Sequence, residues 1–196
     1  GMLAGIERPA LALLLPANKG KVVLTDVGAM VDAKPGWLTQ WAILASRYAS
    51  VALDKKKPTV GLLNIGEERT KGNQLAKTCY PLLNVCRQIN FVGNVENIFS
   101  GRADVVVCDG FVGNVLLKNL EGGLEFFFRG QRKEADYSFY GGALLLGIAG
   151  IVVIAHGKST PKAIENAINL AAEITKKGFL DELRLFRKRV REVHSP

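Results

Sequence analysis

Short apolar runs alternate along the chain with longer segments in which apolar residues recur at helical spacing. Five of the runs have the length and composition of strands that helices cover on both faces. The predicted strands are 21–26, 59–64, 89–92, 104–108 and 150–155. The predicted helices are 37–53, 71–86, 111–128, 161–177 and 179–193. Thr160 followed by Pro161 is a favourable start for the fourth of these helices.

This alternation predicts an α/β fold, a three-layer α/β/α arrangement with a mostly parallel sheet. No linker, internal repeat or low-complexity segment divides the sequence, so we expect residues 1–196 to form a single α/β domain. In open parallel sheets, ligands bind at the carboxyl ends of the strands. We therefore expect the turns that follow the five predicted strands to lie together on one rim.

Each of these turns contains glycine, and most contain Asn, Asp or Glu. Glycine lets the backbone approach a ligand closely, and helix N-termini offer free N–H groups to an anion. Together the turns predict a phosphate-binding rim, although Gly and Asn in any one turn are also ordinary turn formers or helix caps. The candidate phosphate-binding residues are Gly28, Asn64, Gly66, Gly72, Asn73, Asn94, Gly110, Gly113 and Asn114.

Three titratable residues in the turns are candidates for catalysis. Lys71 could contact a phosphate or an oxyanion, or be a solvated surface lysine. Asp109 could orient a lysine or accept a proton, or cap the helix that follows. His156 could protonate a leaving group, because histidine titrates near neutrality, or have a structural role at a strand end. Glu67 and Glu68 could interact with Lys71 and support its role, or form a solvated acidic pair.

Composition narrows the classes of function. Hydrophobic residues make up 48% of the 196 residues, enough to bury a core, and the formal net charge of +8 favours anionic partners. No zinc-finger, RRM or homeodomain pattern is present, so nucleic acid is not an expected partner. The turns contain neither a dinucleotide-binding motif nor a P-loop, so we expect no cofactor and give no support to an oxidoreductase.

The three cysteines cannot all pair within one chain, and reduced thiols in a cytoplasmic protein are the simpler interpretation. Cys108 ends an apolar strand and is expected to be a buried structural thiol rather than a nucleophile. Cys79 and Cys86 share one face of a predicted helix and are expected in or near the core. With two histidines and no close Cys/His cluster, we expect no metal site.

No apolar stretch reaches the roughly 20 residues of a membrane-spanning helix, and we see no secretory signal. The predicted helix 179–193 combines apolar positions such as Phe179, Leu183 and Phe186 with several arginines. It could pack on its own domain, lie on an anionic membrane or bind an acidic partner. The aromatic cluster 126–128 fits core packing, a dimer interface or membrane contact equally well.

Long segments of the sequence resemble the phosphate acyltransferases called PlsX. The resemblance runs from about Ile6 to the predicted helix 161–177, nearly the whole chain, and includes Arg8-Pro-Ala-Leu. It is carried by DVGAMVDAKP (26–35), VGLLNIGEE (60–68), KGN (71–73), NFVGNVE (90–96), ADVVVCDGFVGNVLLK (103–118), YGGALLLG (140–147) and IAHGKS (154–159).

The resemblance implies a fold like those of phosphotransacetylases and isocitrate dehydrogenases, in a cytoplasmic homodimer with peripheral membrane contact. It implies transfer of a fatty acyl group from acyl carrier protein to inorganic phosphate, which gives acyl phosphate for phospholipid synthesis. The alternatives are a phosphate acetyltransferase that uses acetyl-CoA and a non-catalytic ligand-binding fragment.

The sequence departs from the family pattern in three places. An N-terminal region with an Asp-x-x-Gly-Gly-Asp motif is absent. The segment 129–137 is too short to contain the helical insertion that the family has before residue 140, and Met30 stands where the family usually has Asn. We therefore expect the chain to be the carboxyl-terminal part of a longer family architecture.

Overall fold

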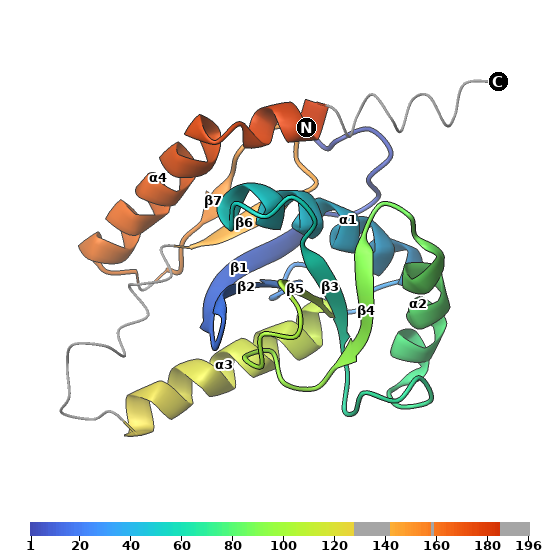
Figure 1. Ribbon diagram of the computed structural model, residues 1–196. Helices are drawn as coiled ribbons and strands as arrows, with labels where there is room; N and C mark the ends of the chain where they lie inside the picture. Colours follow the sequence, from blue (N-terminus) through green and yellow to red (C-terminus); the bar gives the residue numbers. More distant parts are fainter. Residues whose placement is uncertain (128–141, 158, 185–196) are drawn as a thin grey trace.

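The computed structural model of the chain describes residues 1–127, 142–157 and 159–184 (Figure 1). Residues 179–184 are helical, and the rest of the predicted helix 179–193 lies outside the described residues, as does Phe128. The elements are β1 (Ala10–Ala17), β2 (Gly20–Thr25), α1 (Pro35–Ala52), β3 (Thr59–Leu63), α2 (Gln74–Val85), β4 (Asn90–Val95), β5 (Val105–Val107), α3 (Gly110–Phe127), β6 (Ala143–Leu146), β7 (Val153–Ile154) and α4 (Pro161–Lys176).

The seven strands form one sheet in the order β4-β3-β5-β2-β1-β6-β7. Strands β4, β3, β5 and β2 run parallel to one another. Strands β1, β6 and β7 extend the sheet through antiparallel pairings. The α/β class is confirmed, but the sheet is mixed: the predicted parallel arrangement holds for the first four strands and not for the other three.

Side chains alternate between the two faces of the sheet and build two separate cores. In β2, Val23 belongs to the core beneath α1 and α2, whereas Val22 and Leu24 belong to the core on the other face. The second core receives the partly buried apolar side of α3. Helices α1 and α2 thus cover one face and α3 covers the other, which makes the predicted three layers (Figure 1).

The C-terminal helical residues also pack on this domain. Phe179 and Leu183 are buried in the core beneath α1, and the Phe179 ring meets Tyr48 edge-on with 5.8 Å between ring centroids. For these two positions, the interpretation as a helix packed on its own domain is confirmed. Phe186 and the arginines that follow it lie outside the described residues.

Two strands were not predicted, and they decide where the last turn lies. β1 pairs antiparallel with β2, β6 with β1, and β7 with β6. As a result, β7 runs opposite to β2. In the register of the sheet Val153 is level with Thr25, the last residue of β2, so the chain leaves β7 in the direction away from the rim, with β1 and β6 between it and β2. The expectation that five turns share one rim is therefore wrong for the turn that contains His156.

Candidate anion-binding rim

Four turns meet at the carboxyl edge of the parallel strands. The turn after β2 leads to α1, the loop after β3 leads to α2, and β5 passes directly into α3. Three helix N-termini therefore face the same edge, together with the end of β4. Helix N-termini carry unsatisfied N–H groups and a partial positive charge, so this edge suits an anion.

Asp26 organises the first turn. Its buried carboxylate accepts hydrogen bonds from the backbone N–H groups of Leu11, Gly28, Ala29 and Met30, at 2.7–3.1 Å. A carboxylate that accepts this many N–H groups fixes the turn in one conformation. Sequence reasoning did not select Asp26 as a site residue. The available signal was an Asp at the end of an apolar strand, directly before a glycine turn.

The N-terminus of α3 packs closely on this turn. The N–H of Gly110 donates to the Met30 carbonyl at 2.9 Å, and the Asn114 side-chain amide donates to the Val27 carbonyl at 3.1 Å. A Cβ on Gly113 would overlap the backbone carbonyl of Asp26. Gly110, Gly113 and Asn114 thus hold α3 against the Asp26 turn and form part of the rim.

Two other candidates in this area also have partners within the protein. Asp109 is buried, and its carboxylate accepts the N–H of Val112 at 2.9 Å, which is the capping role left open above. Gly28 has a positive φ of 136°, and a Cβ there would lie 2.8 Å from the amide nitrogen of Asn114. Gly28 thus allows the turn and α3 to approach each other.

The loop after β3 is held by its own asparagines. The Asn64 amide donates to the Lys71 carbonyl at 3.1 Å, and the Asn64 side-chain oxygen accepts the N–H of Ile65 at 2.8 Å. Gly72, with φ 98°, leaves room for the Asn64 side chain. Asn73 caps α2 by accepting the N–H of Ala76 at 2.9 Å. These asparagines position the loop that carries Lys71.

Lys71 is the basic candidate that this loop presents to solvent. Its side chain is exposed and makes no ion pair with a described residue, so its ammonium group is available to an anion. Its aliphatic stem passes close to Gly66, where a Cβ would lie 3.2 Å from Lys71 Cγ. Glu67 pairs with Arg102 rather than with Lys71.

Asn94 connects β4 to the same loop. It is only 1% exposed, and its amide nitrogen donates to the Glu68 carbonyl at 2.8 Å. Its side-chain oxygen is buried and has no hydrogen-bond partner among the described residues. Asn94 therefore joins the loop after β3 to β4, and its side chain is buried.

Two of the thiols are buried, as expected. Cys79 and Cys108 lie in the two cores, and Cys86 is half-buried. Burial raises the pKa of the Cys108 thiol well above its usual range, and the nearby carboxylates of Asp109 and Asp26 raise it further. Cys108 is therefore a neutral thiol, whose sulfur donates weakly to the Asp26 carbonyl at 3.5 Å, and not a nucleophile.

His156 does not join this arrangement. It is exposed in the turn after β7, where its carbonyl accepts the N–H of Ser159 at 2.9 Å. Among the described residues no group of three or more His, Cys, Asp or Glu side chains is placed to hold a metal ion. Within the part of the chain that the structure describes, no helix is long and apolar enough to cross a membrane.

The fold is that of the phosphotransacetylases. It matches a branched-chain phosphotransacylase from Enterococcus faecalis with a TM-score of 0.61 and 17% identity, over 89% of this chain and 67% of that one. It matches the EutD phosphotransacetylase from Staphylococcus aureus with a TM-score of 0.60 and 14% identity, over 91% of this chain and 56% of that one. At these identities the likeness concerns the fold alone.

The sequence defines the family. The family model described as "Fatty acid synthesis protein" matches residues 1–133 and 128–182, so the chain belongs to that family. It is 46% identical to a phosphate acyltransferase from Desulforudis audaxviator, over 88% of this chain and 59% of the relative. It is 45% identical to one from Thermodesulfovibrio yellowstonii, over 90% of this chain and again 59% of the relative.

The chain spans about three fifths of the length of these relatives. The alignment with the first of them extends over 199 residues, more than the 196 residues of this chain. That relative therefore carries additional residues within the matched region, which agrees with the shortened internal segment noted in the sequence.

Proposed function

We propose that this chain provides the anion-binding side of a phosphate acyltransferase, which moves a fatty acyl group from acyl carrier protein to inorganic phosphate. The acyl phosphate product would serve phospholipid synthesis. The observation that carries the proposal is that three helix N-termini lie at one edge of the sheet with Lys71, which has no ion-pair partner among the described residues, in a chain of this family. Relatives named phosphate acyltransferase support the choice of reaction.

The chemistry requires little beyond positioning and electrostatics. One phosphate oxygen attacks the thioester carbonyl carbon, the new C–O bond forms, the C–S bond breaks, and sulfur leaves with the electron pair as a thiolate. The thiolate then takes a proton from water or from an acid. Because phosphate is the nucleophile, no covalent enzyme intermediate is needed, and fixed N–H groups and a lysine can stabilise the charges.

The residues of the rim divide into two proposed roles. Lys71 and the backbone N–H groups of Gln74 and Leu75 at the start of α2 would hold phosphate or the developing oxyanion. The start of α1 contributes less, because Pro35 has no N–H and the Trp37 N–H donates to the Lys34 carbonyl. The side chains of Asp26, Asn64 and Asn94 already bond to the backbone, and we assign them to positioning the turns. We give Asp109 the capping role that its bond to Val112 indicates.

Partners and location are part of the same proposal. A basic chain suits the acidic acyl carrier protein, and the family resemblance implies a cytoplasmic homodimer with peripheral membrane contact. Phe126 and Phe127 at the end of α3 are 68% and 77% exposed, which supports an apolar contact with membrane or partner there. We also propose that residues 1–196 act as one α/β domain of a longer architecture, because one continuous sheet links β4 to β7.

The test is a product assay with two acyl donors. The 196-residue chain and the full-length gene product are each incubated with phosphate and either an acyl carrier thioester or acetyl-CoA, and acyl phosphate is trapped with hydroxylamine. The proposal predicts product from the carrier thioester with the full-length protein. Efficient product formation only from acetyl-CoA would instead make it a phosphate acetyltransferase. No product from either donor would leave a ligand-binding protein.

A further inference from the structure

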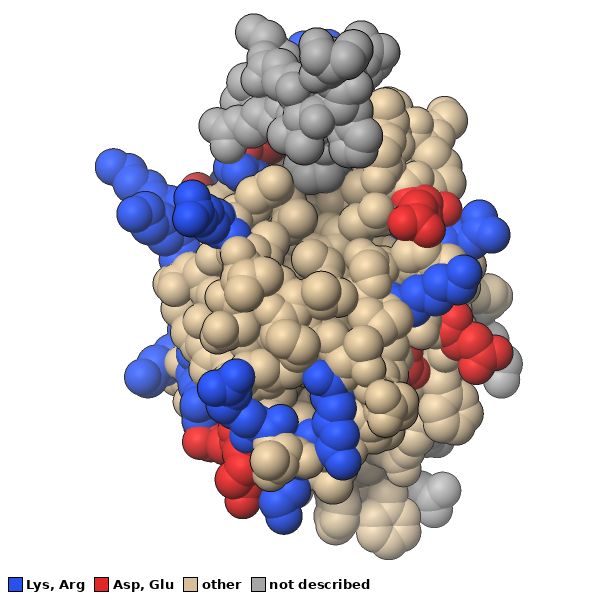
Figure 2. Space-filling view, turned by 90° about the vertical axis from the view of Figure 1, so that its right-hand side faces the viewer, with Lys and Arg blue, Asp and Glu red and all other residues tan. Residues whose placement is uncertain are grey.

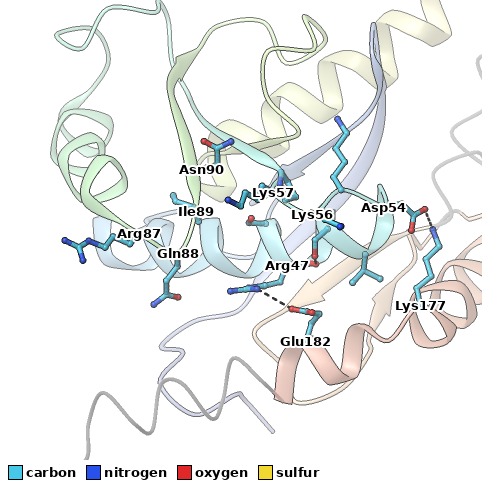
Figure 3. Close-up of a pocket in the computed structure, with 15 residues that line it drawn as sticks. Arg47, Asp54, Lys56, Lys57, Arg87, Gln88, Ile89, Asn90, Lys177 and Glu182 are labelled. Atoms are coloured by element: carbon cyan, nitrogen blue, oxygen red, sulfur yellow. Dashed lines mark hydrogen bonds and ion pairs between the residues drawn. The ribbon is translucent and has the colours of Figure 1, made fainter.

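A groove of about 910 Å³ lies at the edge of the sheet opposite the rim. Its walls are the end of α1, the segment 54–58 before β3, the segment 87–90 at the start of β4, and residues that follow α4 (Figure 3). β3 has five residues, so about 17 Å of strand, at roughly 3.3 Å per residue, separates the groove from the rim. A small molecule in the groove would not touch the rim.

The groove is rich in cations. Its lining contains two carboxylates, Asp54 and Glu182, and six basic residues: Arg47, Lys55, Lys56, Lys57, Arg87 and Lys177. Three of the six have ion-pair partners. Arg47 pairs with Glu182 at 3.4 Å, Lys177 pairs with Asp54 at 2.8 Å, and Lys55 pairs with Asp104.

The other three cations, Lys56, Lys57 and Arg87, make no ion pair with a described residue. Part of this charge offsets the negative ends of nearby helices, because α1, α2 and α4 all end around the groove. Each helix C-terminus is equivalent to about −0.5 of a charge, which sums to about −1.5. Three unpaired cations exceed that amount, so positive charge remains for a ligand.

The shape favours a small molecule. Figure 3 shows Lys56, Lys57 and Arg47 in the central part of the groove, with the segment that carries Gln88 and Ile89 on one side of them. Sites for small molecules occupy roughly 300–1,000 Å³, which includes this volume. A flat membrane surface would reach only the margin of such a hollow.

Figure 2 shows that Lys and Arg also outnumber Asp and Glu on the face of the molecule that it presents.

We propose that this groove binds an organic polyphosphate of nucleotide size, at a site separate from the rim and independent of the proposed acyl transfer. Lys56 and Lys57 precede β3, whereas Arg87 precedes β4, so one ligand must reach cations on two segments. A chain of two or three phosphates has the charge and the length to do so, and lysine and arginine bind phosphate oxygens through charge-assisted hydrogen bonds. Ile89 is half-buried and offers apolar surface to the organic part.

The experiment is a calorimetric titration of the 196-residue chain at an ionic strength of about 0.15 M, where charges more than about 8 Å apart are screened, in EDTA, with ATP, tripolyphosphate or inorganic phosphate. We expect saturable binding of one ATP or one tripolyphosphate per chain, and no saturable binding of inorganic phosphate over the same concentrations. The double variant Lys56→Gln, Lys57→Gln should weaken ATP binding at least about tenfold, since two charged hydrogen-bond donors are lost.

The matched control is Lys19→Gln, Lys21→Gln, which removes the same charge from exposed positions outside the groove. It should leave the Kd for ATP within about twofold, because screened charges at a distance contribute little. Thermal melting of each variant checks that it is folded. The proposal is overturned if neither polyphosphate binds, if the groove variant binds ATP as tightly as the parent, or if the control loses as much affinity. Binding of an acidic carrier protein or of anionic vesicles through Lys56 and Lys57, without ATP binding, would also overturn it.

Discussion

Gly113 lies directly against the backbone carbonyl of Asp26, so closely that any side chain at this position would overlap the carbonyl oxygen. This contact joins the first turn of α3 to the turn whose conformation the Asp26 carboxylate fixes. It is how the chain brings the N-terminus of α3 to the rim.

Replacing Gly113 with alanine should therefore destabilise the protein strongly. The obstructing atom belongs to the backbone, so relief requires α3 or the Asp26 turn to move, and we expect a loss of about 3 kcal/mol in the free energy of unfolding. Urea denaturation measures it. Gly122→Ala in the same helix is the control: a Cβ there meets nothing within 4 Å, and the better helix propensity should stabilise by about 0.5–1 kcal/mol. Equal effects of the two changes would contradict the packing described.

Asp26→Asn should also destabilise the fold. The substitution replaces one carboxylate oxygen with an NH₂ group, which then faces backbone donors such as the N–H of Met30. We expect a loss of about 2–3 kcal/mol, the cost of a lost charged hydrogen bond and an unsatisfied buried donor. Asp32→Asn, at an exposed position in the same segment, is the matched change and should have little effect. A stability difference of less than a few tenths of a kcal/mol between the two variants would count against the role of Asp26.

Asp104 should contribute to stability in a pH-dependent way. Burial acts to raise its pKa, but hydrogen bonds from Lys55 and from the N–H and hydroxyl of Thr59 outweigh it and lower the pKa below its usual range. A carboxyl with a lowered folded-state pKa stabilises the protein above its unfolded pKa of about 3.9, and this contribution is lost as the pH falls through the folded value. The stability difference between the parent and Asp104→Asn should be full at pH 7 and should shrink at a pH near 3. A difference that does not change with pH would contradict this assignment.

The cysteines should differ in reactivity. Burial raises the pKa of Cys79 to about 12, with a smaller opposing effect of a hydrogen bond involving Thr39, and burial raises that of Cys108 as well. Thiolate is the reactive form, so brief alkylation of the folded protein at pH 8 should modify Cys86 before the other two. Mass spectrometry of the digested protein reads this directly. All three should react in urea, and early labelling of Cys108 in the folded state would show that its site is open.

Sequence patterns were sufficient for the parallel half of the fold and for helices α1 to α4. The strands β2, β3, β4 and β5 lie within a few residues of the predicted runs, and Thr160 caps α4 as expected, accepting the N–H of Ala163 at 3.2 Å. These features depend on local signals such as apolar runs and capping residues. The family membership came from long stretches of matching sequence, not from any single turn.

The antiparallel half could not be predicted in the same way. β1 contains Pro16, which argues against a strand, yet Pro16 is tolerated because it lies opposite Lys21 near the end of the β1–β2 hairpin. β6 has only four residues and follows a glycine. Strand direction depends on pairing partners far away in the sequence, so the orientation of β7, and with it the position of His156, was not encoded locally.

The asparagines show a similar limit for the site. Asn64, Asn73 and Asn114 lie where the sequence suggested, but their side chains bond to the backbone of the loops themselves. Residue type and position predict the rim, whereas the choice between holding a loop and holding a ligand depends on distances that the sequence does not contain. Lys71 is the candidate whose side chain remains available.

The most direct test of the account is the dependence of acyl phosphate formation on phosphate concentration, measured with the full-length gene product carrying Lys71→Gln. The account predicts that kcat/KM for phosphate falls at least about 100-fold, the usual effect of removing one preorganised charge-stabilising group. Lys19→Gln, at an exposed lysine in the turn between β1 and β2, should leave it unchanged, and the melting temperatures of both variants should match that of the parent. Retention of the parent kcat/KM by Lys71→Gln would contradict the assignment of this rim as the phosphate site.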